Sequence, residues 1–237
     1  MKKITKRLLV LAAFLLILAG GCVWYVNDYY HSEGVEECLA GSWQVKVTEI
    51  EQGLFFDGEG EKQALIFYPG AKVEYTAYAP LLTRIAEEGM DCFLVKMPFN
   101  LAILGQNKAD GILKEYTYEE WYLAGHSLGG AMAASYASDH ADKLSGLVLL
   151  AAYPTKSLAD KEISVLTIYG SEDQVLNRGK LEDGRGLMPK SSVELCIEGG
   201  NHAWFGNYGE QKGDGKASIS REEQQRQTVE AISDMVR

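Results

Sequence analysis

The chain has 237 residues, a length typical of one domain and short for two. Its composition, 46% hydrophobic and 24% charged, is that of a folded protein and excludes disorder for most of the chain. The net charge is −10, and basic residues are concentrated at the amino terminus, so the rest of the chain would repel phosphate backbones. We therefore expect no nucleic-acid partner.

The amino-terminal residues have the pattern of a membrane-spanning segment. Basic residues precede an uninterrupted apolar run, Leu8 to Val26, which is close to the roughly 20 residues that cross a bilayer as a helix. Positive charge before such a run predicts a cytoplasmic amino end, and Trp24 and Tyr25 suit the headgroup region. We expect residues 1–30 to be a single-pass anchor in the cell membrane, with the rest of the chain extracellular.

Two other kinds of targeting segment fit the same residues. A cleaved secretory signal peptide would use Leu8 to Ala19 as its apolar core and Ala19 to Gly21 as its cleavage site. A lipoprotein would be cut before Cys22, although Ala19 stands where lipoprotein signals normally carry leucine. All three alternatives place the domain outside the cytoplasm, and we expect the segment to contribute location and not chemistry.

Residues 31–40 are acidic and polar and are predicted to form a linker, so that the folded domain spans residues 41–237. The domain opens with two runs, Trp43 to Ile50 and Leu54 to Phe56, whose apolar residues predict strands. Turn residues Asp57-Gly58 follow the second run. We expect these strands to form an antiparallel opening of the sheet.

After these strands, apolar runs alternate with helical stretches. That alternation predicts an α/β fold with a mostly parallel central sheet flanked by helices. About a dozen residues separate Ala152 from Ser164, which leaves no room for a large lid domain there, and the glycine-rich stretch Ala203 to Ser218 is predicted to be a loop. The predicted strands are Ala64 to Tyr68, Cys92 to Met97, Trp121 to Ala124, Leu144 to Ala152, Ser164 to Tyr169 and Val193 to Ile197. The predicted helices are Tyr75 to Glu88, Leu128 to Ser138 and Arg221 to Val236.

The pattern Gly-x-Ser-x-Gly occupies residues 125–129, between an apolar strand and a helix of small residues. A sharp turn of this kind strains the backbone of the serine and needs very small residues two positions before and after it, which Gly125 and Gly129 provide. The pattern predicts Ser127 as a nucleophile. It also predicts that the backbone N–H of Leu128, at the start of the helix, donates to an oxyanion.

Besides the Gly-x-Ser-x-Gly turn, four further stretches of the sequence resemble those of a known family. They are Tyr68 to Val73, Val95 to Ala102, Gly199 to Ala203, and the tail Phe205 to Gly209 with Gly213 to Gly215. With them, roughly Gln63 to the end of the chain resembles an α/β-hydrolase, specifically the small lid-less branch, fold 5, that is related to dienelactone hydrolases. Dienelactone hydrolases carry a cysteine nucleophile where this chain has Ser127, so their substrate is not carried over.

The resemblance implies that the nucleophile, the acid and the base follow one another in the order Ser, Asp, His. Of the four histidines, His31 lies in the predicted linker, His140 lies at a helix end, and His126 is expected to pack beneath the turn. His202 follows the last predicted strand. By position and by elimination it is the predicted general base, a role that suits a group titrating near neutral pH.

The acid is expected to accept a hydrogen bond from the histidine Nδ1–H and to orient the ring. The resemblance implies Asp173, which follows the predicted strand Ser164 to Tyr169. Glu172 and Asp183 are the alternatives in the same stretch of chain.

A second oxyanion donor is implied by the loop Pro69-Gly70-Ala71, which stands where related enzymes more usually have His-Gly. By similarity the donor is the backbone N–H of Ala71, and Gly70 allows the chain to approach a substrate closely. Lys72 is expected to be a solvated charge; the alternative is that it attracts an anionic substrate.

The four cysteines show no metal-ligand spacing, and we expect neither a metal nor another cofactor. Cys92 and Cys196 lie in apolar strand-like runs and are predicted to be buried, with one disulfide left open as an alternative.

The resulting functional hypothesis is a serine hydrolase that cleaves small carboxylic esters through an acyl-enzyme at the outer face of the membrane. A lipase, a peptidase or a thioesterase would use the same residues. A non-catalytic extracellular binding domain on the same fold is the alternative from another class.

Overall fold

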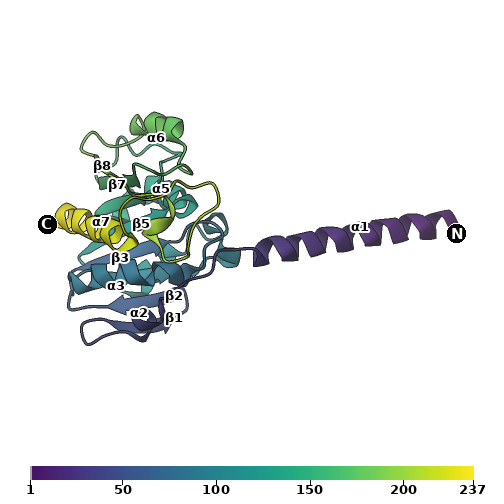
Figure 1. Ribbon diagram of the computed structural model, residues 1–237, viewed down its shortest axis with the longest axis horizontal. Coiled ribbons are helices and arrows are strands. Elements are labelled where there is room, and N and C mark those ends of the chain that lie inside the picture. Colours follow the sequence, from purple (N-terminus) through teal and green to yellow (C-terminus); the bar gives the residue numbers. More distant parts are fainter. Residues whose placement is uncertain (1) are drawn as a thin grey trace.

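The structure is a computed structural model that describes the backbone of residues 2–237 and the side chains of residues 6–237. Its centre is an eight-stranded sheet with the order β1-β2-β4-β3-β5-β6-β7-β8 (Figure 1). Strand β2 runs antiparallel to β1 and β4, and all other neighbours are parallel, so the predicted mostly parallel sheet is confirmed. The strands are β1 (Lys46–Ile50), β2 (Gly53–Asp57), β3 (Gln63–Tyr68), β4 (Asp91–Val95), β5 (Glu120–His126), β6 (Gly146–Leu150), β7 (Ser164–Gly170) and β8 (Val193–Ile197).

Helices cover both faces of this sheet because its central strands are apolar on both faces. Along β3, Leu65 and Phe67 belong to one buried cluster, whereas Ala64, Ile66 and Tyr68 belong to another, as the two-residue period of a strand requires. Helices α3 (Ala79–Glu87) and α7 (Arg221–Val236) cover the first cluster, and α5 (Leu128–Asp139) covers the second (Figure 1). The α/β-hydrolase arrangement without a large lid domain is therefore present.

Two short helices within residues 41–237 were not expected from the sequence, α4 (Ala109–Glu115) and α6 (Arg178–Arg185). Each contains glycine, and α6 shows no run of apolar residues at helical spacing, so the pattern that predicts a helix is weak in both. The predicted helix Tyr75 to Glu88 is a 3₁₀ turn, Tyr75–Tyr78, followed by α3. The stretch Ala203 to Ser218 is a loop as predicted, apart from the 3₁₀ turn Ala203–Phe205.

Cys92 is buried in β4, as predicted, but the prediction that Cys196 is buried is wrong. Cys196 lies in β8, which pairs on one side only, with β7, and forms an edge of the sheet. An edge strand is covered less completely than a central one, so an apolar run there does not imply burial.

Helix α1 (Lys2–Asn27) extends away from the domain (Figure 1). Its residues Lys6–Asn27 are long and apolar enough to cross a membrane, and none of the most apolar part is buried against the domain. A signal sequence has the same length and composition, so the helix agrees with each of the alternatives for the amino terminus.

Residues 31–40, predicted to form a linker, are instead packed on the domain. Helix α2 (Glu36–Ala40) lies in this segment, and the side chain of Val35 just before it is 3% exposed. The backbone N–H of Ser32 donates to Glu74 Oε2 at 2.9 Å, and that of Glu33 donates to the carbonyl oxygen of Asn207 at 2.9 Å. The acidic composition of the segment predicts a linker, but these contacts make the segment part of the folded domain.

Replacing Val35 with alanine should therefore destabilise the domain, because two buried methyl groups lose their contacts. We expect a loss of about 1–2 kcal/mol in the free energy of unfolding, measured by chemical denaturation of the full chain in a nonionic detergent. Val193→Ala is the matched control, because Val193 is 59% exposed. If both variants unfold like the parent chain, residues 31–40 are not part of the cooperative unit.

Candidate active site

Strand β5 ends at His126 and helix α5 begins at Leu128, so Ser127 alone makes the turn between them. Its backbone has φ 52° and ψ −122°, a conformation that is strained for any residue with a side chain. The turn is held by the Ser127 N–H, which donates to the carbonyl oxygen of Leu150 at 2.9 Å. The predicted strand-turn-helix with a strained serine is confirmed.

The two glycines of this turn are needed for packing. A side chain at Gly125 would place its Cβ 2.5 Å from the carbonyl carbon of Gly129, and one at Gly129 would collide with the carbonyl oxygens of Tyr68 and Pro69. Both neighbours are backbone atoms, which cannot move aside without shifting β3 or α5. The close approach of Gly129 also brings the loop after β3 directly against the serine turn.

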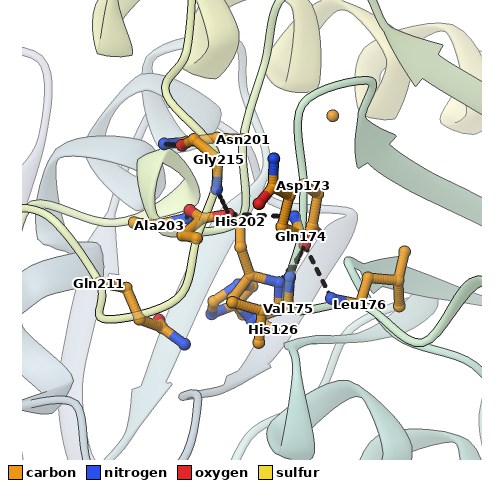
Figure 2. Close-up of polar contacts among 12 residues, drawn as sticks. His126, Asp173, Gln174, Val175, Leu176, Asn201, His202, Ala203, Gln211 and Gly215 are labelled. Carbon is orange, nitrogen blue, oxygen red and sulfur yellow. Dashed lines mark hydrogen bonds and ion pairs between the residues drawn. The ribbon is translucent and has the colours of Figure 1, made fainter.

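His202 lies in the loop that follows β8 and is 1% exposed. Its Nδ1 is 2.8 Å from Asp173 Oδ2 (Figure 2), and its Nε2 is buried without a hydrogen-bond partner in the described part of the chain. A histidine held at Nδ1 with Nε2 unpartnered has the arrangement that a general base requires.

Asp173 lies in the turn after β7 and is 5% exposed. Its Oδ1 accepts from the backbone N–H groups of Val175 and Leu176 at 2.9 and 2.8 Å, which leaves Oδ2 for His202 (Figure 2). The side chain of Arg178 donates to the carbonyl oxygen of Gly170 at 2.6 Å and so ties this turn to the end of β7. The carboxylate that binds His202 is therefore that of Asp173.

The other two acidic candidates make no such contact. Glu172 accepts a hydrogen bond from the hydroxyl of Ser171, next to it in the chain, and Asp183 lies in helix α6. The backbone N–H of Glu172 donates to the carbonyl oxygen of Gly200 at 2.8 Å. That bond joins the Asp173 turn to the loop of His202, so it holds the two partners at a fixed spacing.

A buried glutamine on α7, which no sequence motif marks, holds the loop that contains His202. Gln224, 0% exposed, accepts from the backbone N–H of Asn201 at 2.9 Å and donates to the Asn201 carbonyl oxygen at 2.8 Å. Asp214 accepts from the backbone N–H of Ala203 at 2.9 Å. His202 is thus fixed on both sides in the chain. The only signal in the sequence was a polar residue on the helix face that Val229 and Ile232 also occupy.

His126 packs beneath the turn, as predicted, and connects three loops. Its ring lies 4.6 Å from that of His202, centroid to centroid, and its Nδ1 is 2.8 Å from the hydroxyl of Tyr78. The same hydroxyl accepts from the backbone N–H of Gly70 at 3.1 Å. His202 therefore lies against the residue that precedes Ser127.

Among residues 2–237 no hydrogen bond joins Ser127 to His202. Hydrogen bonds between a nucleophile and its base are often long in enzymes without a bound substrate.

The two backbone groups predicted to bind an oxyanion lie on neighbouring segments. Tyr68 of β3 is paired with Gly125 of β5, so the loop that contains Ala71 leaves the sheet beside the serine turn. Within residues 2–237 neither the Ala71 N–H nor the Leu128 N–H donates to another residue.

Lys72, which follows Ala71, is less solvated than expected. Its backbone has φ 57°, its N–H donates to the carbonyl oxygen of Asn100 at 2.8 Å, and its Nζ is 2.7 Å from Asp28 Oδ2. The carbonyl oxygen of Lys72 accepts from the backbone N–H of Tyr30 at 2.7 Å. Residues of the segment expected to contribute only location therefore contact the loop that contains Ala71.

The chain belongs to the α/β hydrolase family. A family model described as 'Alpha/beta hydrolase family' matches residues 64–226, which is more than half of the chain. A search of curated proteins finds no match. Within the described residues, no group of three or more histidine, cysteine and acidic side chains is arranged to hold a metal ion.

Two solved structures are similar to the chain in fold. A protein described as a predicted CIB-like hydrolase from Thermoplasma acidophilum superposes with a TM-score of 0.58 and 15% identity, covering 81% of this chain and 99% of its own. The dienelactone hydrolase from Anabaena variabilis gives a TM-score of 0.58 and 12% identity, covering 81% of this chain and 97% of its own. At these identities the likeness concerns the fold alone.

Burial and the neighbouring His202 lower the pKa of His126 well below its ordinary value of 6.5. Below pH 6.5 the unfolded chain therefore binds a proton at this residue that the folded chain does not. The free energy of unfolding consequently decreases as the pH is lowered. We expect wild type to lose about 1.4 kcal/mol more than His126→Gln between about pH 7.5 and pH 5.5, measured by chemical denaturation. Equal losses in the two proteins would contradict this account.

Proposed function

We propose that the protein is a serine hydrolase that cleaves small carboxylic esters through an acyl-enzyme. The observation that carries the proposal is the buried contact of 2.8 Å between Asp173 and His202, beside the strained turn that presents Ser127. His202 contacts Asp173, and His126, which precedes Ser127 in the chain, packs against His202. The proposal also includes attachment of the domain to the outer face of the cell membrane through α1, which the length and apolar character of that helix support.

In the proposed reaction, Ser127 Oγ attacks the ester carbonyl carbon while Nε2 of His202 takes the hydroxyl proton. Asp173 holds the Nδ1–H and stabilises the charged ring that forms. The backbone N–H groups of Leu128 and Ala71 donate to the carbonyl oxygen as it becomes an anion. His202 then returns the proton to the departing alcohol, and water hydrolyses the acyl-enzyme by the same steps with His202 again as base.

Ser127→Ala should abolish ester turnover and leave the fold intact, because only the attacking hydroxyl is removed. Wild-type full chain should be labelled covalently by a fluorophosphonate probe and Ser127→Ala should not. Loss of a serine nucleophile costs on the order of 10⁶-fold in related mechanisms. Residual turnover within about tenfold of wild type would remove Ser127 from the proposal, and an unlabelled, inactive wild type would favour a non-catalytic binding domain.

Asp173→Asn should lower the turnover rate by about 10⁴-fold, because an amide favours the wrong tautomer of His202 while the packing is kept. Glu172→Gln is the matched control and should change the rate far less, since Glu172 makes no hydrogen bond to His202. The measurement is kcat for a soluble short-chain ester. If Glu172→Gln lowers kcat more than Asp173→Asn does, the acid is Glu172.

A further inference from the structure

The exit of helix α1 lies close to the candidate active site. The helix ends at Asn27, and Tyr30 already forms a parallel bridge with Val73 in the loop after β3. The Tyr30 N–H donates to Lys72 at 2.7 Å, and the Tyr30 carbonyl oxygen accepts from Glu74 at 2.8 Å. Only two residues separate the helix from this bridge, so Asn27 and Tyr30 are at most about 11 Å apart.

This loop belongs to the edge of the sheet at which the candidate site lies. Strands β3, β5 and β7 are parallel, so the loop with Ala71, the turn at Ser127 and the turn with Asp173 all leave the sheet at the carboxyl ends of these strands. Helix α1 joins the domain on this side, as Figure 1 shows. A membrane crossed by α1 would therefore face the carboxyl edge and not the opposite edge.

Exposed apolar side chains are concentrated on the same edge. Phe99, Ile103 and Leu104, which follow β4, are 63%, 60% and 56% exposed. Val175, which follows β7, is 37% exposed. Outside α1, the only other large apolar side chains exposed among the described residues are Trp43, before β1, and Val193, at the start of β8; both lie at the amino edge.

The segment with Phe99 is held in a defined conformation close to α1. Phe99 and Asn100 have φ values of 52° and 55°, and the Asn100 carbonyl oxygen accepts from the Lys72 N–H at 2.8 Å. Helix α1 also contacts the 3₁₀ turn Pro98–Asn100. Lys72 Nζ also lies 4.5 Å from the ring centroid of Tyr25 in α1, an aromatic residue of the kind that lies at the headgroup level.

We propose that this carboxyl edge docks on the bilayer, with Phe99, Ile103 and Leu104 in the interface, and that the site accepts acyl esters presented at the membrane surface. The substrate class rests on the proposed ester hydrolysis and on α1 as the anchor. Because the tether is so short, the effective concentration of the bilayer at this edge is high, and a small apolar patch is sufficient for contact. An ester whose chain lies in the outer leaflet then reaches Ser127 from the interface.

Contact with lipid can be measured without activity. The full chain, with Cys22, Cys38 and Cys196 replaced by serine, is placed in phosphatidylcholine nanodiscs and labelled at Ile103→Cys with a polarity-sensitive fluorophore. Lipids brominated on their acyl chains should quench this label. The same label at Val193→Cys, equally exposed at the opposite edge, should not be quenched. Equal quenching at both positions, or none at residue 103, overturns the docking.

Turnover tests the substrate class separately. We expect the double variant Ile103→Ser/Leu104→Ser to lose about fivefold or more in rate on a long-chain ester embedded in vesicles, and to keep the wild-type rate on a soluble butyryl ester. Val193→Ser should keep both rates. Equal losses on both esters, or on neither, overturn the substrate class. A wild type that cleaves neither ester contradicts the proposed function instead, while the quenching result still decides the docking.

Discussion

The hydroxyl of Tyr78 joins two loops of the candidate site directly and a third through His126. It accepts from Gly70, in the loop with Ala71, and contacts His126, which precedes Ser127 and packs against His202. Burial raises the pKa of Tyr78 well above its usual value, so the hydroxyl keeps its proton and binds as a neutral group. Because the loops come from β3, β5 and β8, contacts within a single loop cannot fix their relative positions, and Tyr78 supplies contacts between loops.

The positions that the sequence could predict are those whose constraint is local. A turn made by one residue needs glycine on both sides, and this limits the serine turn to residues 125–129 whatever surrounds it. His202 could be chosen because the other histidines lie in places that a base cannot use. The roles of Ser127, Asp173 and His202 stay predictions, although the structure brings the last two into contact.

The positions that the sequence could not predict depend on contacts between distant segments. Gln224 and Tyr78 look like ordinary helix residues until the fold places them against the loops of Asn201 and Gly70. Cys196 looked buried because an apolar run does not reveal that its strand is the last in the sheet. Residues 31–40 looked like a linker because their composition is acidic, and the contacts that fix them come from residues 74 and 207.

If α1 anchors the domain as proposed, the contacts of Asp28, Tyr30 and Ser32 also limit how the domain can be released from the membrane. Signal-peptide cleavage near Gly21, or processing before Cys22, removes only chain that lies before these contacts, so each maturation route yields the same folded domain. Shedding by a protease that cuts after Tyr30 is different. It would remove the Tyr30 bridge from the loop that contains Ala71, so the shed form would differ from the proposed membrane-bound form beside the candidate site as well as in location.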